Sequence, residues 1–278
     1  MAEVPPVSGL SAKVEKKRKR QADESTKEES KATNDSKPTE GPSKKKQRRK
    51  KNKQASKEQD IKDEERKNGI DESIGKMDGR LLADHFAQKL KRHNKELTEV
   101  EISDLYIPDS AFLDTSSFEG ARSMDKLPDF LKNFSPKGFD LSKAAEEKGS
   151  PHTLVIAAAA LRAADLVRGL RAFQTKESIV GKLFAKHIKL EEAKQFLERA
   201  RIGLGVGTPQ RLSDLIDSGK LKLDHLERIV IDGSHIDQKQ RGVFDMKETH
   251  LPLLQLLTRS ELRDRYGAKQ KRIQILVF

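Results

Sequence analysis

Between residues 150 and 278, short apolar runs alternate with stretches in which apolar residues recur every three or four positions. Short apolar runs are typical of buried strands, and the longer spacing is typical of amphipathic helices. The pattern predicts strands at 152–158, 182–187, 201–207, 226–232 and 272–278. It predicts helices at 160–173, 189–200, 209–219 and near 248–262. Because strands that alternate with helices favour parallel pairing, the expected fold class is α/β with a single parallel sheet.

The pattern is sparser from 67 to 149. Four apolar residues at near-helical spacing predict a helix within 70–96, and they are Leu81, Leu82, Phe86 and Leu90. From 97 to 134, single aromatic and aliphatic residues stand among turn residues, which predicts an extended arm with a helix near 124–134. The helix and the arm either dock on a partner or pack on their own domain, and the sequence leaves both alternatives open.

Composition changes the picture for the first 66 residues, which are rich in Lys, Glu, Ser, Gln and Pro and nearly lack large apolar residues. Such a segment cannot bury enough surface to offset the entropy of ordering it, so we expect disorder. The predicted organisation is therefore a disordered basic tail at 1–66, a helix with an extended arm at 67–149, and a sheet domain at 150–278.

Positive charge is concentrated in the tail. Residues 1–60 hold 18 Lys and Arg against 10 Asp and Glu, and the whole chain has a net charge of +12. Two basic clusters predict nuclear localisation signals, with nucleic-acid contact as a compatible function and a solvated tail without a specific reader as the alternative. The clusters consist of Lys16, Lys17, Arg18, Lys19 and Arg20, and of Lys44, Lys45, Lys46, Arg48, Arg49, Lys50 and Lys51.

Cysteine is absent, which excludes disulfides and cysteine-based zinc sites and is consistent with a reducing compartment. The N-terminus has no apolar core of the signal-peptide type, and no run of about 18 apolar residues occurs. We therefore expect a soluble intracellular protein that does not bind membranes.

The segment "TPQRLSDLIDSGKLKLDHLERIVIDGSH" resembles the first RecA-like domain of DEAD-box RNA helicases. Thr208 to Arg211 match the Thr-Pro-Gly-Arg motif, with Gln210 in place of glycine. Asp232 matches the first position of the Asp-Glu-Ala-Asp motif, whereas Gly233, Ser234 and His235 depart from it. The resemblance covers about residues 150–278 and implies a degenerate RecA-like domain.

The departures argue against ATP hydrolysis. A phosphate-binding loop of the form G-x-x-x-x-G-K-[ST] is absent from the sequence, and Gly233 cannot supply the second carboxylate. We also expect no second RecA-like domain, because the sequence ends at Phe278, directly after the last predicted strand. No catalytic residue, cofactor or metal is expected.

The same resemblance implies that Thr208 and Arg211 contact RNA, with Arg162 as a further candidate if the alignment shifts by two residues. The alternative is structural. Thr208 would then cap the following helix, Pro209 would begin it, and Arg211 would be solvated.

Taken over its whole length, the chain resembles the CMS family of nucleolar proteins. The resemblance rests on the basic tail, on "DLYIPDSAFLDTSSF", on "LPDFLKNF" and on the degenerate "TPQRL…VIDGSH" region. It implies a non-enzymatic ribosome-assembly factor in the nucleus and nucleolus. Its partners would be pre-ribosomal RNA and proteins of the small-subunit processome, the large early particle that contains the U3 snoRNP. Two alternatives remain open, a helicase-like enzyme with a composite ATP site and a chromatin-associated factor that binds DNA through its tail.

Overall fold

A computed structural model describes residues 66–278, and both basic clusters lie outside this range. Its centre is a sheet of five parallel strands in the order β4-β5-β3-β6-β7. The strands are β3 (Thr153–Ile156), β4 (Ile179–Leu183), β5 (Ile202–Gly207), β6 (Arg228–Ile231) and β7 (Gln274–Val277). The predicted α/β fold with one parallel sheet is confirmed.

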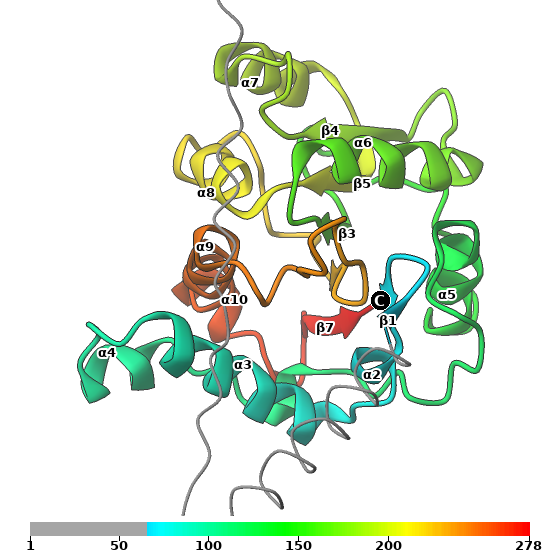
Figure 1. The fold of residues 1–278 in the computed structure, drawn as a ribbon. Coiled ribbons are helices and arrows are strands. Elements are labelled where there is room, and N and C mark those ends of the chain that lie inside the picture. Colours follow the sequence, from blue (N-terminus) through cyan, green and yellow to red (C-terminus); the bar gives the residue numbers. More distant parts are fainter. Residues whose placement is uncertain (1–65) are drawn as a thin grey trace, which may run out of the picture. The chain divides into compact units, whose positions relative to one another are not determined.

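Helices cover both faces of the sheet, which explains why its strands are continuous apolar runs in the sequence. Successive residues of β3 point to opposite faces. Leu154 and Ile156 belong to the apolar cluster that includes residues of α3, α7, α8 and α9, whereas Val155 belongs to the cluster that includes residues of α5 and α6. Figure 1 shows α7, α8 and α9 on one side of the sheet and α5 and α6 on the other.

The helices that follow the strands lie close to the predicted positions. They are α6 (Ala160–Gly169), η3 (Leu170–Phe173), α7 (Leu190–Arg199), α8 (Pro209–Asp217), α9 (Lys247–Leu257) and α10 (Ser260–Arg263). Pro209 occupies the first turn of α8, and Gly219 follows its end with φ +68°, a left-handed conformation that favours glycine. Within residues 66–278, no helix has the length and apolar character needed to cross a membrane.

The second predicted strand was misplaced, because β4 spans Ile179–Leu183 rather than 182–187. Gly181 and Lys182 interrupt the apolar run that marks the true strand, so the pattern shifted toward Phe184. Leu81 also differs from the prediction, since 53% of it is exposed while Leu82, Phe86 and Leu90 are buried.

The segment before the sheet domain contains β1 (Arg66–Lys67), β2 (Ile70–Asp71), α2 (Glu72–Gly75), α3 (Gly79–His93), α4 (Glu99–Asp104), η1 (Asp109–Ala111), η2 (Met124–Lys126) and α5 (Leu127–Asn133). Helix α3 packs against α9 and η1. The arm runs along β7, where the Leu113 amide donates to the Ile275 carbonyl oxygen at 2.8 Å and Phe112 forms a parallel bridge with Ile275. The helix therefore packs on a helix of the chain's own sheet domain, and the arm packs on β7.

Candidate functional site

The carboxyl ends of the strands are the natural place to look for a site, because ligands of open parallel sheets bind outside these ends. Ile156 of β3 is in register with both Gly207 of β5 and Ile231 of β6. Thr208 and Asp232, which directly follow the two strands that flank β3, therefore emerge at the same edge of the sheet.

Asp232 is held by an arginine of the same chain. Arg162 Nε donates to Asp232 Oδ2 at 2.8 Å, and Arg162 Nη2 donates to Asp232 Oδ1 at 2.9 Å. The Asp232 side chain is 1% exposed and that of Arg162 is 13% exposed. Burial alone would lower the pKa of Arg162, but the hydrogen bonds and negative charge of Asp232 outweigh it and raise that pKa. A cation at this carboxylate would have to compete with a two-pronged, charge-assisted contact.

Gly233, the next residue, has no room for a side chain. A Cβ atom there would lie 2.5 Å from Val277 Cγ1 and 3.0 Å from Phe244 Cε2, and both of these side chains are buried. The Gly233 amide donates to the carbonyl oxygen of Phe278 at 2.8 Å. Because its surroundings are fully packed, a carboxylate at this position would require the core to rearrange.

Ser234 and His235 are covered by the β1–β2 hairpin. The Asp71 amide donates to the Ser234 carbonyl oxygen at 2.7 Å, and the Ile236 amide donates to the Gly69 carbonyl oxygen at 3.0 Å. Ser234 is fully buried, and its hydroxyl has no hydrogen-bond partner among residues 66–278. Burial lowers the pKa of His235, and the nearby Arg162 charge lowers it further.

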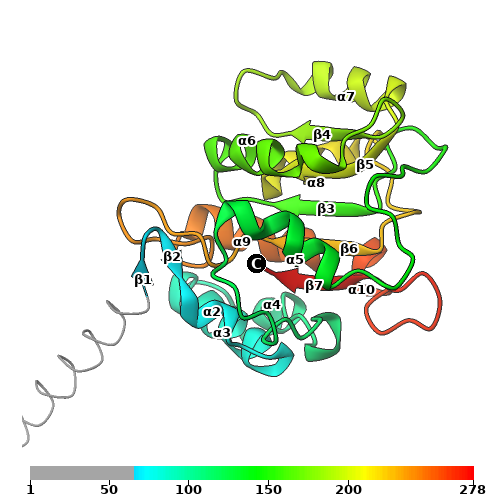
Figure 2. The same cartoon turned by 90° about the vertical axis from the view of Figure 1, so that its right-hand side faces the viewer.

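A group of charges fixes the hairpin in this position. Arg66 contacts Asp71 at 2.7 Å and Asp245 at 3.3 Å, and Lys89 of α3 also pairs with Asp245. Burial would raise the pKa of Asp245, but the Lys89 hydrogen bond and the Gly242 amide lower it. In Figure 2 the hairpin lies beside the loop between β6 and α9, to which Asp245 belongs.

Thr208 and Arg211 lie at the start of α8. Thr208 has the extended backbone of an N-cap residue, although its side chain makes no capping hydrogen bond. Arg211 is half-buried, and its Nη1 donates to the Ile188 carbonyl oxygen at 3.0 Å. The structural alternative thus holds for the position of Thr208 and for Pro209, while Arg211 is anchored rather than fully solvated. Within residues 66–278, no hydrogen bond joins Thr208 or Arg211 to Arg162.

Arg122 of the arm is a key structural residue that the sequence did not indicate. It is 5% exposed and donates to the carbonyl oxygens of Gly75 at 2.7 Å, Thr115 at 2.8 Å, and Val277. Its guanidinium lies 5.2 Å from the Phe130 ring centre, and burial lowers its pKa to about 10. Because its partners are far apart in the chain, no periodicity or local motif could have revealed its role.

Together, these features define an α/β protein whose sheet has its usual ligand-binding edge occupied by the chain's own groups. Arg162 binds both oxygens of the Asp232 carboxylate, the packing around Gly233 leaves no room for a carboxylate side chain there, and the hairpin covers Ser234 and His235. Within residues 66–278, no group of three or more His, Cys, Asp or Glu side chains is placed to hold a metal ion.

Comparison with known families identifies the group to which this protein belongs. The model of the CMS1 family, described as the U3-containing 90S pre-ribosomal complex subunit, matches residues 11–278. The chain therefore belongs to the CMS1 family, and the resemblance to CMS proteins is confirmed. The finer likeness to DEAD-box helicases stays a prediction.

Relatives extend from fungi to vertebrates. Protein CMS1 of Chaetomium thermophilum is 52% identical over 210 residues, which cover 76% of this chain and 84% of that protein. Protein CMSS1 of Homo sapiens is 34% identical over 194 residues, covering 69% of this chain and 67% of that protein. Protein cms1 of Schizosaccharomyces pombe is 30% identical over 192 residues, covering 69% of this chain and 68% of that protein.

Proposed function

We propose that this protein is a non-enzymatic scaffold subunit of the 90S pre-ribosomal complex that binds pre-ribosomal RNA and neighbouring assembly proteins in the nucleolus. Family membership supports its place in the complex. The absence of catalysis is supported by the occupied edge of the sheet.

The Arg162–Asp232 ion pair is the observation that carries this proposal. Hydrolysis of a nucleotide needs a magnesium ion that is held by acidic side chains and bridges the phosphates. Both carboxylate oxygens of Asp232 instead accept hydrogen bonds from Arg162 at 2.8 and 2.9 Å. The packing around Gly233 then removes the position from which a second carboxylate could activate water. Asp232 thus anchors α6 to the sheet.

RNA binding is proposed for two regions. The basic clusters at 16–20 and 44–51 carry the charge needed to neutralise phosphates and to serve as nuclear import signals. Within the sheet domain, Arg211 donates to the Ile188 carbonyl oxygen, and Ile188 directly follows the exposed Lys186 and His187. Arg162 is assigned to the ion pair, because binding a phosphate would require it to leave the buried Asp232.

Two measurements test the proposal. Protein–RNA crosslinking in cells should recover pre-ribosomal RNA, and replacing Thr208 and Arg211 with alanine should reduce crosslinks within the sheet domain. A Lys137→Ala variant, changed at an exposed site, is the matched control. Recovery of genomic DNA in place of pre-ribosomal RNA would support a chromatin factor instead.

The enzymatic alternative is tested with the purified full chain. We expect no magnesium-dependent ATP hydrolysis and no nucleotide binding by calorimetry. ATP turnover that requires magnesium and disappears in the Asp232→Ala variant would overturn the non-enzymatic proposal.

A further inference from the structure

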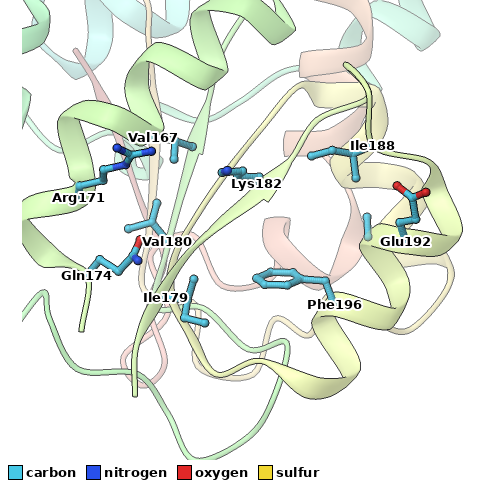
Figure 3. A pocket seen from close by; sticks show the side chains of 10 residues that line it. Val167, Arg171, Gln174, Ile179, Val180, Lys182, Ile188, Glu192 and Phe196 are labelled. Atoms are coloured by element: carbon cyan, nitrogen blue, oxygen red, sulfur yellow. The ribbon is translucent and has the colours of Figure 1, made fainter. Parts of the chain in front are cut away.

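A trough runs along the outer side of β4. This strand ends the sheet, and no strand within residues 66–278 pairs with its outer edge. A cavity of about 450 Å³ lies there (Figure 3). It shares lining residues with two adjoining hollows of about 470 and 600 Å³, so the depression follows the strand. We define the β4 trough by Val167, Arg171, Ile179, Lys182, Ile188 and Phe196.

The walls of the β4 trough offer apolar contacts beside an open strand edge. Figure 3 shows Val167 on one side of β4, and on the other side Ile188, just before α7, and Phe196 of α7 itself. Ile179, Ile188 and Phe196 are only half-buried, so part of each side chain is open to a partner. An unpaired edge flanked by apolar pockets is the arrangement by which proteins add an extended peptide to a sheet.

The charge around the β4 trough is positive. Its two carboxylates are engaged within the chain, since Asp165 pairs with Arg168 and Glu192 accepts a hydrogen bond from the Lys189 amide at 3.1 Å. Four exposed cations line the trough and its adjoining hollows without an ion pair inside the described range 66–278, and they are Arg171, Lys176, Lys182 and Lys186.

We propose that the β4 trough binds an extended acidic segment of another protein, which adds to the sheet as a strand beside β4. Alternate side chains of the segment pack against Ile188 and Phe196 on one face of the sheet, and the carboxylates between them face Arg171 and Lys182 on the other face. The inference rests on the proposed scaffold function, because that function supplies protein partners.

Neither the chain's own tail nor an RNA strand matches the β4 trough as well. The N-terminal tail carries 18 basic against 10 acidic residues in 1–60, so its charge has the same sign as the trough. Single-stranded RNA binds on platforms of several aromatic rings, whereas Phe196 is the one aromatic residue that lines the central cavity within 66–278. Edge strands are often protected from aggregation by a lysine or a bulge, and β4 has both, in Lys182 and in the bulge between Ile179 and Val180. Protection against aggregation alone, however, explains neither the hollow beside β4 nor the three other cations that line it.

The test uses the purified full chain and a labelled ten-residue peptide of alternating valine and glutamate, followed by fluorescence anisotropy. A peptide with glutamine in place of glutamate and a uridine decamer are the comparison ligands. We expect the acidic peptide to bind on the order of tenfold more tightly than the glutamine peptide, since several exposed charge pairs contribute together. Hydrogen exchange at the β4 amides should slow when the acidic peptide binds.

The double variant Arg171→Glu with Lys182→Glu should weaken peptide binding on the order of tenfold or more. The double variant Arg80→Glu with Lys137→Glu changes the net charge equally at exposed sites outside the trough, and it should bind like the wild type. Equal loss in both variants, or tighter binding of the uridine decamer than of the acidic peptide, overturns the inference. Neither result would bear on the proposed function, because pre-ribosomal RNA crosslinking and ATP turnover test that function independently.

Discussion

Breaking the Arg162–Asp232 ion pair should destabilise the fold by an amount that depends on which partner is removed. Replacing Arg162 with methionine leaves a carboxylate that is 1% exposed without its counter-charge. Removing one partner of a buried pair costs about 3–5 kcal/mol. Replacing Asp232 with asparagine should cost less, about 1–2 kcal/mol, because Arg162 is 13% exposed and an amide oxygen can still accept one of its hydrogen bonds.

The double variant should be more stable than the sum of the two single changes implies, with a coupling of about 2 kcal/mol or more.

The assay is urea unfolding of the full chain followed by far-ultraviolet circular dichroism, because the protein has no tryptophan. Helix α6 supplies a matched control in Arg168 and Asp165, an ion pair whose side chains are 66% and 40% exposed. The cycle Arg168→Met with Asp165→Asn should give a coupling below about 0.5 kcal/mol. A coupling at Arg162–Asp232 as small as that of the control would refute the view that this pair anchors the sheet edge.

Gly233→Ala should lower the free energy of unfolding by about 1–3 kcal/mol through overpacking. Gly169→Ala should not, because its added Cβ would lie at an ordinary 3.5 Å from Met124. Denaturant unfolding curves compare the two variants, and equal effects would contradict the packing argument. Leu82→Ala should lower the free energy of unfolding by about 2–5 kcal/mol and Leu81→Ala by less than about 0.5 kcal/mol, because only Leu82 is buried. Thermal unfolding that ranks the two variants in the opposite order would show that α3 packs through a different face. The free energy of unfolding should also fall as the pH drops from 6.5 toward 4, because histidines bind protons in the unfolded chain but stay neutral where they are buried in the folded protein. The loss should be on the order of 3 kcal/mol or more, and urea unfolding at several pH values measures it. A flat profile would argue against the lowered pKa values of the buried histidines. The histidines concerned are His85 and His152, whose pKa burial lowers to about 4, and His250, whose pKa burial lowers to about 3.

The sheet could be predicted because its strands are buried on both faces. A fully buried strand must be apolar throughout, so β3, β5, β6 and β7 stand out as runs between helical patterns. Strand β4 was placed too late because, at the edge of the sheet, Lys182 is exposed and breaks the run. An edge strand is only partly buried, and its pattern is correspondingly weaker.

Local chemistry also predicted parts of the candidate site. Thr208, Pro209 and Gly219 mark the limits of α8 through backbone preferences that each residue carries with it. The position of Asp232 at the end of β6 followed from the strand pattern alone. The partner of Asp232 did not, because Arg162 lies 70 residues earlier and its contact depends on how two strands align.

The sequence by itself determined the alternation of strands and helices, the parallel sheet, the basic character of residues 1–60 and the glycine at position 233. These properties depend on residue type and short-range spacing. Only the tertiary structure decided that Arg162 pairs with the Asp232 carboxylate, that Arg122 links the arm to β7 through a hydrogen bond, and that the hairpin covers Ser234 and His235. Each of these contacts joins groups that are distant in the chain, and their geometry exists only after the sheet and its helices have packed.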